Sequence, residues 1–311
     1  MKRNLLVLSV LFSLPVLISS ARGAETAAPA TPETDAPTQP AKPSEEYLLR
    51  YKFATDETIR WKVTHLGTTE TKISGNTQSS KSRSVSTKLW QVKEVDPQGK
   101  FTFTHSVENV DMWQQVSDRP EVAYNSQSGA EAPPEYQQVA KTVGKPLTSA
   151  TITDSGQILE KGGESSKFNL GLGDIIMLLP PKPVHAGSSW YEPSELQVRQ
   201  PDGRVDHIKI RKRYTLEKVQ TGLATIQVKT EVLTPVDDPR IQAQLVQQLT
   251  NGTIKFDVDA GRIVAKQMDW DEVVVGFRGP DSEMKYLARF TEELVSDDTA
   301  TASSQPAVPR R

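Results

Sequence analysis

The sequence predicts a mainly β protein made of antiparallel, curled sheets. Between residues 47 and 295 apolar and polar side chains alternate with a period of two, as in Ile59 to His65 and Phe101 to Val107, and this alternation indicates strands with one buried face. Short clusters of Asp, Pro, Ser and Gly separate the runs, and such residues form the tight turns of hairpins. The close spacing of turns favours antiparallel neighbours.

Six segments carry the strand pattern clearly and are separated by recognisable turns. The strands are expected over residues 59–65, 101–107, 208–214, 224–232, 270–277 and 284–290. Turns are expected over residues 96–99, 154–156, 201–203, 220–222 and 259–261.

Two segments break the strand pattern, and each has a proline at or next to its first residue, followed by good helix formers. They cover residues 133–143 and 238–250. Proline is tolerated in the first turn of a helix, so both are expected to be short helices. The second has an apolar stripe that could cover one face or an open end of a sheet. The order of hairpins and helices also suggests two similar halves, residues 47–180 and 181–295, joined near residues 163–187.

The N-terminal segment has the three-part layout of a secretory signal peptide. Lys2 and Arg3 precede an apolar run from Leu5 to Ile18, and small residues follow it. The small residues place the cleavage after Gly23, with cleavage two residues earlier as the alternative. Because the run is shorter than the ~20 residues of a spanning helix, the sequence predicts an exported protein, periplasmic or extracellular. A retained membrane anchor is the less favoured interpretation, and no transmembrane segment is expected after the signal is removed.

Two further segments have the composition of disordered chain. Residues 24–46 are almost entirely Ala, Pro, Thr and Glu, and residues 296–311 are similarly poor in large apolar side chains. Such segments bury too little apolar surface to offset the entropy of ordering. A linker and a tail are therefore expected around the folded region.

The composition excludes several chemistries. The 311 residues include no Cys, so disulfides, thiolate metal sites and a cysteine nucleophile are impossible. Removal of residues 1–23 leaves 34 Lys and Arg against 39 Asp and Glu, a net charge of −5. This sign opposes nucleic-acid binding.

The most apolar stretch of the mature chain is a candidate ligand-binding segment. It runs through Ile175, Ile176, Met177, Leu178 and Leu179. A short core plug, ended by the two prolines that follow, is one interpretation. The lining of an apolar cavity between the two halves is the other.

A basic stripe is the second candidate for ligand binding. Lys209, Arg211 and Arg213 alternate with apolar residues and share one face of a predicted strand. Cations spaced by about 7 Å could hold an anionic polymer or a lipid head group. A solvated face, or an edge strand protected by its charges, is the simpler interpretation.

No catalytic, metal or cofactor pattern is present in the sequence. The four histidines form no ligand pair, although His65 and His105 both fall on the buried face of their strands and could meet across a sheet. Asp257, Asp259 and Gly261 resemble the start of a calcium loop, but the remaining ligand positions are missing, so a hairpin turn is predicted. No cofactor and no metal are therefore expected.

The order of several short motifs resembles a known family. Phe53-x-x-Asp56-Glu57-x-x-Arg60-Trp61, Pro183-Val184-x-x-Gly187-x-x-Trp190 and Gly252-x-Ile254-x-Phe256-Asp257 follow one another along the chain. They resemble an uncharacterised family of secreted all-β proteins of planctomycete-type bacteria, a domain of unknown function. The resemblance implies an exported, envelope-associated role and transfers no catalytic residue.

These observations favour an exported, non-catalytic protein that binds an apolar or envelope-derived ligand, or that scaffolds an envelope protein. A carboxylate-dependent hydrolase acting on an extracellular polymer is one alternative. A structural surface protein that assembles through its sheet edges is the other.

Overall fold

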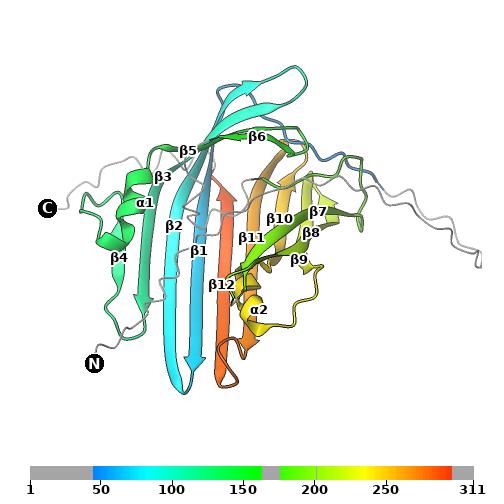
Figure 1. Cartoon of the computed structure of the whole chain (residues 1–311). Helices are drawn as coiled ribbons and strands as arrows, with labels where there is room; N and C mark the ends of the chain where they lie inside the picture. The colour runs from blue at the N-terminus through cyan, green and yellow to red at the C-terminus, as the bar shows by residue number, and fades with distance from the viewer. Residues whose placement is uncertain (1–44, 163–175, 201, 296–311) are drawn as a thin grey trace, which may run out of the picture.

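The protein forms one large antiparallel sheet, as seen in a computed structural model that describes residues 45–162, 176–200 and 202–295 (Figure 1). The mainly β prediction is confirmed, and the six predicted strand segments coincide with strands apart from the last two residues of 270–277. The strands are β1 (Thr58–Ile73), β2 (Asn76–Val95), β3 (Phe101–Val116), β4 (Val122–Asn125), β5 (Pro146–Ile152), β6 (Ile158–Gly162), β7 (Ser189–Arg199), β8 (Val205–Gln220), β9 (Leu223–Val232), β10 (Asn251–Asp257), β11 (Arg262–Val275) and β12 (Ser282–Leu294).

The first and last strands pair with each other and join the two halves of the chain. The strand order is β6-β5-β3-β2-β1-β12-β11-β10-β9-β8-β7, and β4 pairs with β3. Strand β1 pairs with β12 from Trp61↔Leu294 to Ile73↔Ser282. A continuous ladder of backbone hydrogen bonds runs across the boundary, so the two halves share one sheet, a point that the sequence leaves open. The prediction of curled sheets is wrong, because the sheet is not strongly curled. The internal repeat is not shown by this arrangement and stays a prediction.

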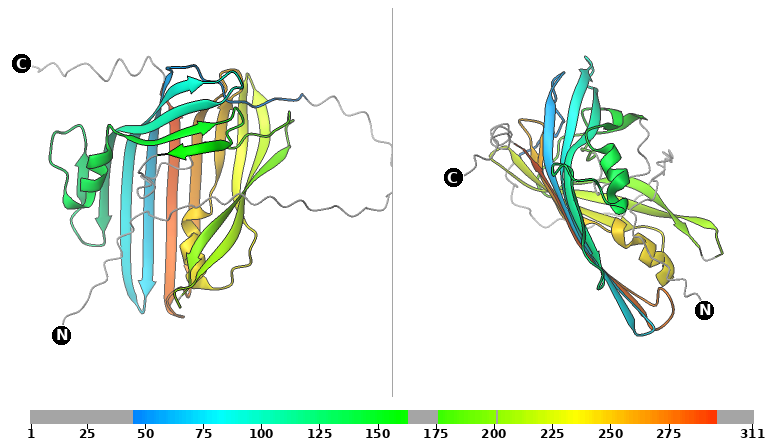
Figure 2. Two further views of the ribbon diagram at one scale, coloured as in Figure 1. Left: turned by 45° about the horizontal axis from the view of Figure 1, so that its top comes forward. Right: turned by 90° about the vertical axis from the view of Figure 1, so that its left-hand side faces the viewer.

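Both predicted helices are present, and both are short. The first consists of the 3-10 turn Pro134–Tyr136 and α1 (Gln137–Thr142), and the second of α2 (Pro239–Leu245) and the 3-10 turn Val246–Gln248. Helix α2 begins where the sequence predicts, because the Asp238 side chain accepts a hydrogen bond from Arg240 N and a proline follows it. Figure 2 shows that α1 and α2 lie on the same side of the sheet, which we call the inner face.

The main core lies on the inner face. Residues 45–57 and 176–184 cross this face as two covering segments outside the sheet. Tyr47 and Val184 form an isolated bridge between them, and Arg50 donates hydrogen bonds to the carbonyl oxygens of Pro180 and Pro181. Leu49 and Tyr51 of the first segment are buried in the main hydrophobic cluster, where the Tyr51 ring packs edge-on against Phe256 of β10. The covering segments thus shield the strands that meet at the β1–β12 junction.

Several predictions fall on residues outside the described part of the chain. These are the signal peptide with its cleavage after Gly23, the linker over residues 24–46 apart from its last two residues, the tail over residues 296–311, and Ile175. Within the described residues, no helix is long and apolar enough to cross a membrane.

Gly252 is required by the close approach of β10 and β11. A Cβ atom at this position would press on the Gln267 carbonyl oxygen and lie 2.7 Å from Met268 Sδ. We expect Gly252→Ala to lower the free energy of unfolding by about 1–3 kcal/mol, because the strands would have to separate. The measurement is urea denaturation. Gly162→Ala in β6 is the matched control, since a Cβ atom added there would meet nothing within 4 Å; equal losses in both variants would contradict the packing explanation.

Candidate functional site

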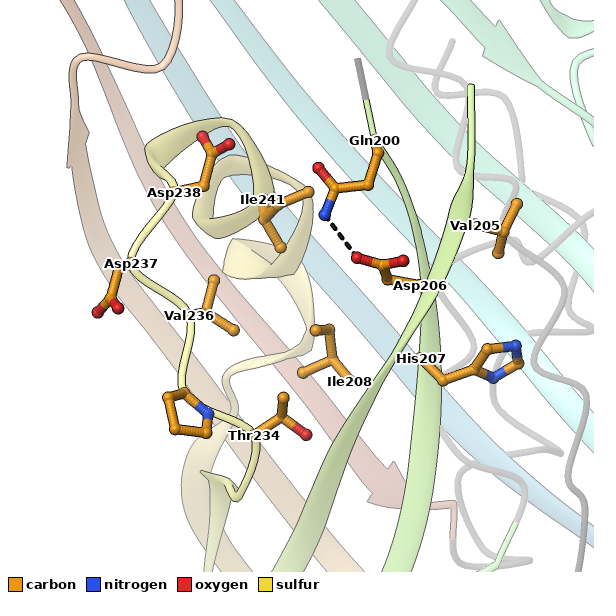
Figure 3. Close-up of a pocket in the computed structure, with 11 residues that line it drawn as sticks. Gln200, Val205, Asp206, His207, Ile208, Thr234, Val236, Asp237, Asp238 and Ile241 are labelled. Carbon is orange, nitrogen blue, oxygen red and sulfur yellow. Dashed lines mark hydrogen bonds between the residues drawn. The ribbon is translucent and has the colours of Figure 1, made fainter. Parts of the chain in front are cut away.

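An open groove lies between the β7–β8 hairpin, the loop after β9 and α2. Its volume is about 490 Å³, and its described lining consists of Gln200, Val205, Asp206, His207, Ile208, Thr234, Pro235, Val236, Asp237, Asp238 and Ile241. Figure 3 shows these side chains arranged around the space between β8 and α2.

The floor of the groove is apolar and continuous with a small core. Ile208 and Ile241 are buried and pack with Val236 in a hydrophobic cluster that also includes Leu245 of α2. Strand β8, helix α2 and the loop after β9 all contribute to this one cluster, so packing holds the floor in place. A ligand that rests on this floor would meet apolar surface already ordered by the fold.

The rim of the groove carries hydrogen-bond acceptors. Asp206 accepts a hydrogen bond of 2.6 Å from Gln200 Nε2, and in Figure 3 these two side chains face each other at one end of the groove. Asp238 is engaged by Arg240 in a 2.6 Å ion pair. Asp237 points away from Asp206 (Figure 3). The rim therefore favours a group that donates hydrogen bonds or carries positive charge.

A second candidate site is a buried ion pair on the inner face. Lys88 Nζ of β2 lies 2.7 Å from Glu292 Oε1 of β12, and the two side chains are 1% and 2% exposed. The pair spans β1, where Trp61 stands opposite Lys88 and Val63 opposite Glu292. Burial of two charges costs several kcal/mol per ion before their attraction is counted. Such a pair therefore needs further partners to be stable.

Aromatic rings and a second lysine surround this pair. Lys88 Nζ lies 4.5 Å from the centre of the Trp61 ring and 5.2 Å from that of Trp90, within range of a cation–π interaction. Lys266 of β11 is the direct cross-strand neighbour of Glu292 and is also buried. Glu292 thus has a lysine on each side of its strand.

Four polar atoms in this cluster are buried without a hydrogen-bond partner in the described structure. They are Trp90 Nε1, His105 Nε2, Glu292 Oε2 and Lys88 Nζ, whose contact with Glu292 Oε1 is an ion pair. Trp90 and His105 are cross-strand partners on β2 and β3, so the unpartnered atoms lie close to Lys88. Each unsatisfied buried group costs about 1–3 kcal/mol. We call Lys88, Trp90, His105, Lys266 and Glu292 the buried cluster.

Burial and neighbouring charges shift the pKa values in the buried cluster. Burial lowers the pKa of Lys88 to about 8, although Glu292 opposes this change. Burial alone would raise the pKa of Glu292, but the charges of Lys266 and Lys88 outweigh it and hold this pKa below its ordinary value. Burial, with the charge of Lys88, lowers the pKa of His105 to about 4. At neutral pH the lysine and the glutamate of the ion pair are charged and His105 is neutral.

Further buried polar side chains lie on the neighbouring strands β7 and β8. Tyr214 OH donates a 2.7 Å hydrogen bond to Glu192 Oε2, and burial raises the pKa of Glu192 despite this bond. Burial and the charge of Lys266 lower the pKa of Lys212 to about 7. Lys212 and Glu192 therefore extend the electrostatic region of Lys88, Lys266 and Glu292 along the inner face.

The predicted apolar segment lies in the core as far as it is described. Ile176, Met177 and Leu179 belong to the main hydrophobic cluster on the inner face. The carbonyl oxygen of Met177 accepts a hydrogen bond from Tyr51 OH, and that of Leu178 accepts one from Trp190 Nε1. None of these residues lines the groove.

The predicted basic stripe lies on the opposite side of β8 from the buried residues, and its charges are partly compensated. Arg211 and Arg213 both contact Glu231 of β9, at 2.7 and 3.1 Å, and Arg211 also lies over the ring of Tyr191. Lys209 is exposed. None of the three basic residues belongs to the described lining of the groove or to the buried cluster.

The two histidines of the sequence analysis do not meet. His65 pairs with Ser84 of β2, whereas His105 pairs with Trp90, six residues further along that strand, which is about 20 Å. The ring of His65 instead contacts Trp270. Asp257 ends β10 and accepts a hydrogen bond from Ala260 N, which confirms the predicted hairpin turn. In the described ranges, no group of three acidic or histidine side chains could hold a metal ion.

Sequence reasoning missed the buried cluster, although a signal was present. Lys88 lies on the same buried face of its strand as Trp90 and Val92, and Glu292 lies on the same buried face as Phe290. A charged residue on the apolar face of a strand requires a partner when buried. The identity of that partner depends on the pairing of β1 with β12, which no local pattern specifies.

Comparisons with known proteins support a family-level similarity. A family model described as a family of unknown function (DUF6263) matches residues 136–263. This agrees with the resemblance to a domain of unknown function, and it does not address the bacterial group or secretion. No curated protein matches the chain.

Two solved structures show a distant similarity. The first is lipovitellin, in a study of its lipid–protein interactions, with a TM-score of 0.44 and 10% identity over 84% of this chain; the chain spans 27% of that protein. The second is a DUF1329 family protein from Desulfovibrio piger, with a TM-score of 0.15 and 12% identity over 73% of this chain and 83% of the other. At these values neither similarity carries a functional conclusion.

We expect Lys88→Met to lower the free energy of unfolding by about 3–5 kcal/mol, because it leaves Glu292 buried and unpaired. The double variant Lys88→Met/Glu292→Leu should recover much of this loss. Urea denaturation measures both. The matched control is the exposed pair Arg289–Asp269, joined at 2.6 Å, whose disruption by Arg289→Met should cost about 1 kcal/mol or less. If the double variant loses as much free energy of unfolding as the two single substitutions added together, the energetic coupling between Lys88 and Glu292 is contradicted.

His105 should make the protein less stable in mild acid. Its pKa is lowered to about 4 in the folded state and is about 6.5 when unfolded. Between these values the unfolded chain binds more protons, so stability falls as the pH drops from about 6.5 to 4, by up to about 3 kcal/mol. His105→Gln should flatten the stability profile in this window. His207→Gln, which alters an exposed histidine, should keep the slope of the wild type.

Proposed function

We propose that this protein is an exported, non-catalytic binding protein that holds an amphipathic, envelope-derived ligand in the groove beside α2. The observation that carries the proposal is the groove itself, with an apolar floor at Ile208, Val236 and Ile241 and a polar rim. Its volume of about 490 Å³ is typical of small-molecule sites, which span ~300–1,000 Å³.

The polar rim indicates which end of the ligand it contacts. Asp206 lies at one end of the groove beside Gln200. An ionised carboxylate only accepts hydrogen bonds. The ligand is therefore proposed to place an amine or another donor group near Asp206, and its apolar part on the floor.

A scaffolding role is a second candidate, favoured by the outer face of the sheet. Leu66, Leu287, Val273 and Val275 lie on the neighbouring strands β1, β12 and β11 and are 44–59% exposed. On neighbouring strands these side chains are offset by two residues from direct cross-strand pairing, so they run diagonally across the sheet. Exposed apolar groups that adjoin one another are typical of protein contact surfaces. A hydrolase receives less support, because Asp206 and Asp237 point in different directions (Figure 3).

Ligand binding in the groove can be tested by filling it. Mature protein purified gently from its own host is analysed by native mass spectrometry and should carry a reproducible extra mass that is lost on denaturation. Val236→Trp should remove at least about 90% of this mass, because the indole would occupy the floor. Val232→Trp is the matched control, since Val232 is 38% exposed and lies outside the groove lining.

Three outcomes decide between the candidates. Loss of the extra mass in Val236→Trp alone supports the proposal. A bare monomer in the wild type, or an extra mass that survives in Val236→Trp, contradicts groove binding. A co-purified protein that Leu287→Lys releases would instead support scaffolding.

A further inference from the structure

The groove borders a stretch of β8 that β9 is too short to pair with. The ladder between the two strands begins at Ile210↔Val232, so residues 205–209 of β8 extend beyond it. At the limit of this stretch, Lys209 N donates a 2.9 Å hydrogen bond to Thr234 Oγ1, and the Lys209 carbonyl oxygen accepts one of 2.8 Å from the first residue after β9. The chain then leaves β8 and forms the loop that leads to α2. The edge of β8 before Lys209 therefore opens onto the groove.

The backbone of His207 faces the same way as that of Lys209. Residues two apart along a strand direct their N–H and C=O groups to the same side, and the residues between them face the other side. Strand β7 occupies that other side, since the Arg204 carbonyl oxygen accepts a 2.7 Å hydrogen bond from Gln200 N. The N–H and C=O groups of His207 therefore point to the position that a longer β9 would occupy. Among the described residues, no backbone group pairs with them there.

The side chains in Figure 3 agree with this placement. Val205 and His207 belong to the described lining of the groove, yet their side chains point away from α2. Their main chain is therefore the part that borders the groove. Ile208 points toward α2 and contributes to the apolar floor. The groove thus combines open main-chain donors and acceptors with apolar side chains.

This combination favours an extended peptide over an acyl chain. A strand added beside β8 would exchange two hydrogen bonds with His207, whereas a hydrocarbon chain in the same place would cover these groups and leave them unpaired. The described lining contains three aspartates, Asp206, Asp237 and Asp238, and no lysine or arginine. Arg240 compensates only Asp238. The lining therefore favours a basic peptide over an acidic one.

We propose that the groove binds an extended, basic peptide segment as an added strand beside β8. This inference rests on the groove proposed above as the binding site, and it names the class of ligand. The peptide runs antiparallel to β8 in the position that β9 leaves, and its central residue pairs with His207. The residues before and after the central one then lie beside Ile208 and Asp206, which share one face of β8. The expected pattern is an apolar residue, any residue, and then Lys or Arg.

Calorimetric titration of the mature protein with the peptide acetyl-Thr-Leu-Thr-Lys-Thr-amide provides the test. Binding should saturate, and it should shift the amide signal of His207 in the NMR spectrum of 15N-labelled protein. An ester oxygen in place of the N–H of the central Thr removes the donor to the His207 carbonyl oxygen, so it should weaken binding about three- to tenfold. The same replacement at the Lys of the peptide is the matched control, because that N–H points away from β8.

Two protein variants and a second peptide test the position of the added strand. Asp206→Asn should weaken binding about two- to fivefold, because it removes the charge opposite the peptide Lys. Asp271→Asn is the matched control, since Asp271 is exposed and lies outside the described lining. Val236→Trp should abolish binding by filling the floor. A peptide with Leu and Lys exchanged should bind at least about threefold more weakly, because both side chains then face the wrong neighbours.

Dodecylamine, which has a cationic end but no amide group, separates this inference from the groove proposal. If dodecylamine binds in a manner that Val236→Trp removes, while the peptide does not bind, the peptide is the wrong ligand and the groove proposal stands. Peptide binding that survives Val236→Trp contradicts the position beside β8. Equal affinity of the two ester peptides, or of the two residue orders, contradicts the added strand.

Discussion

The pairing of β1 with β12 is the interaction on which the rest of the structure depends. It joins the first and last strands over a register from Trp61↔Leu294 to Ile73↔Ser282 and makes one sheet of two chain halves. Long-range pairing of this kind gains its hydrogen bonds only after a large loop has closed. The inner face of both halves can then be covered by the same two segments, residues 45–57 and 176–184.

The buried cluster is a direct consequence of that pairing. Lys88 and Glu292 are separated by about two hundred residues, and only the insertion of β1 between β2 and β12 brings them to 2.7 Å. Burial of the ion pair is unfavourable. The Coulomb attraction between Lys88 and Glu292, and the contact of Lys88 Nζ with the faces of two indole rings, offset this cost. The same arrangement leaves donors and an acceptor without partners among the described residues. The cluster therefore differs from a packed apolar core, because its hydrogen-bonding groups are only partly satisfied.

The groove and the buried cluster use different parts of the fold for different chemistry. The groove lies where β8 and α2 diverge, and its floor is ordered by packing between strand and helix. The buried cluster lies on the strands around the β1–β12 junction. Acceptors dominate the groove rim, whereas the cluster is built around the Lys88–Glu292 ion pair.

The sequence by itself determined the mainly β class, the positions of both helices and the hairpin turns, because alternation, proline placement and turn residues act over a few neighbouring positions. Lys88 and Glu292 also lie on the apolar faces of their strands, a signal that the sequence analysis did not use. The tertiary structure alone decided that the halves share one sheet, that Lys88 meets Glu292, that His65 and His105 stay apart, and that Ile208 and Ile241 form a groove floor. Strand partners far apart in the chain are selected by the combined burial of whole faces, and no short window of residues contains that information.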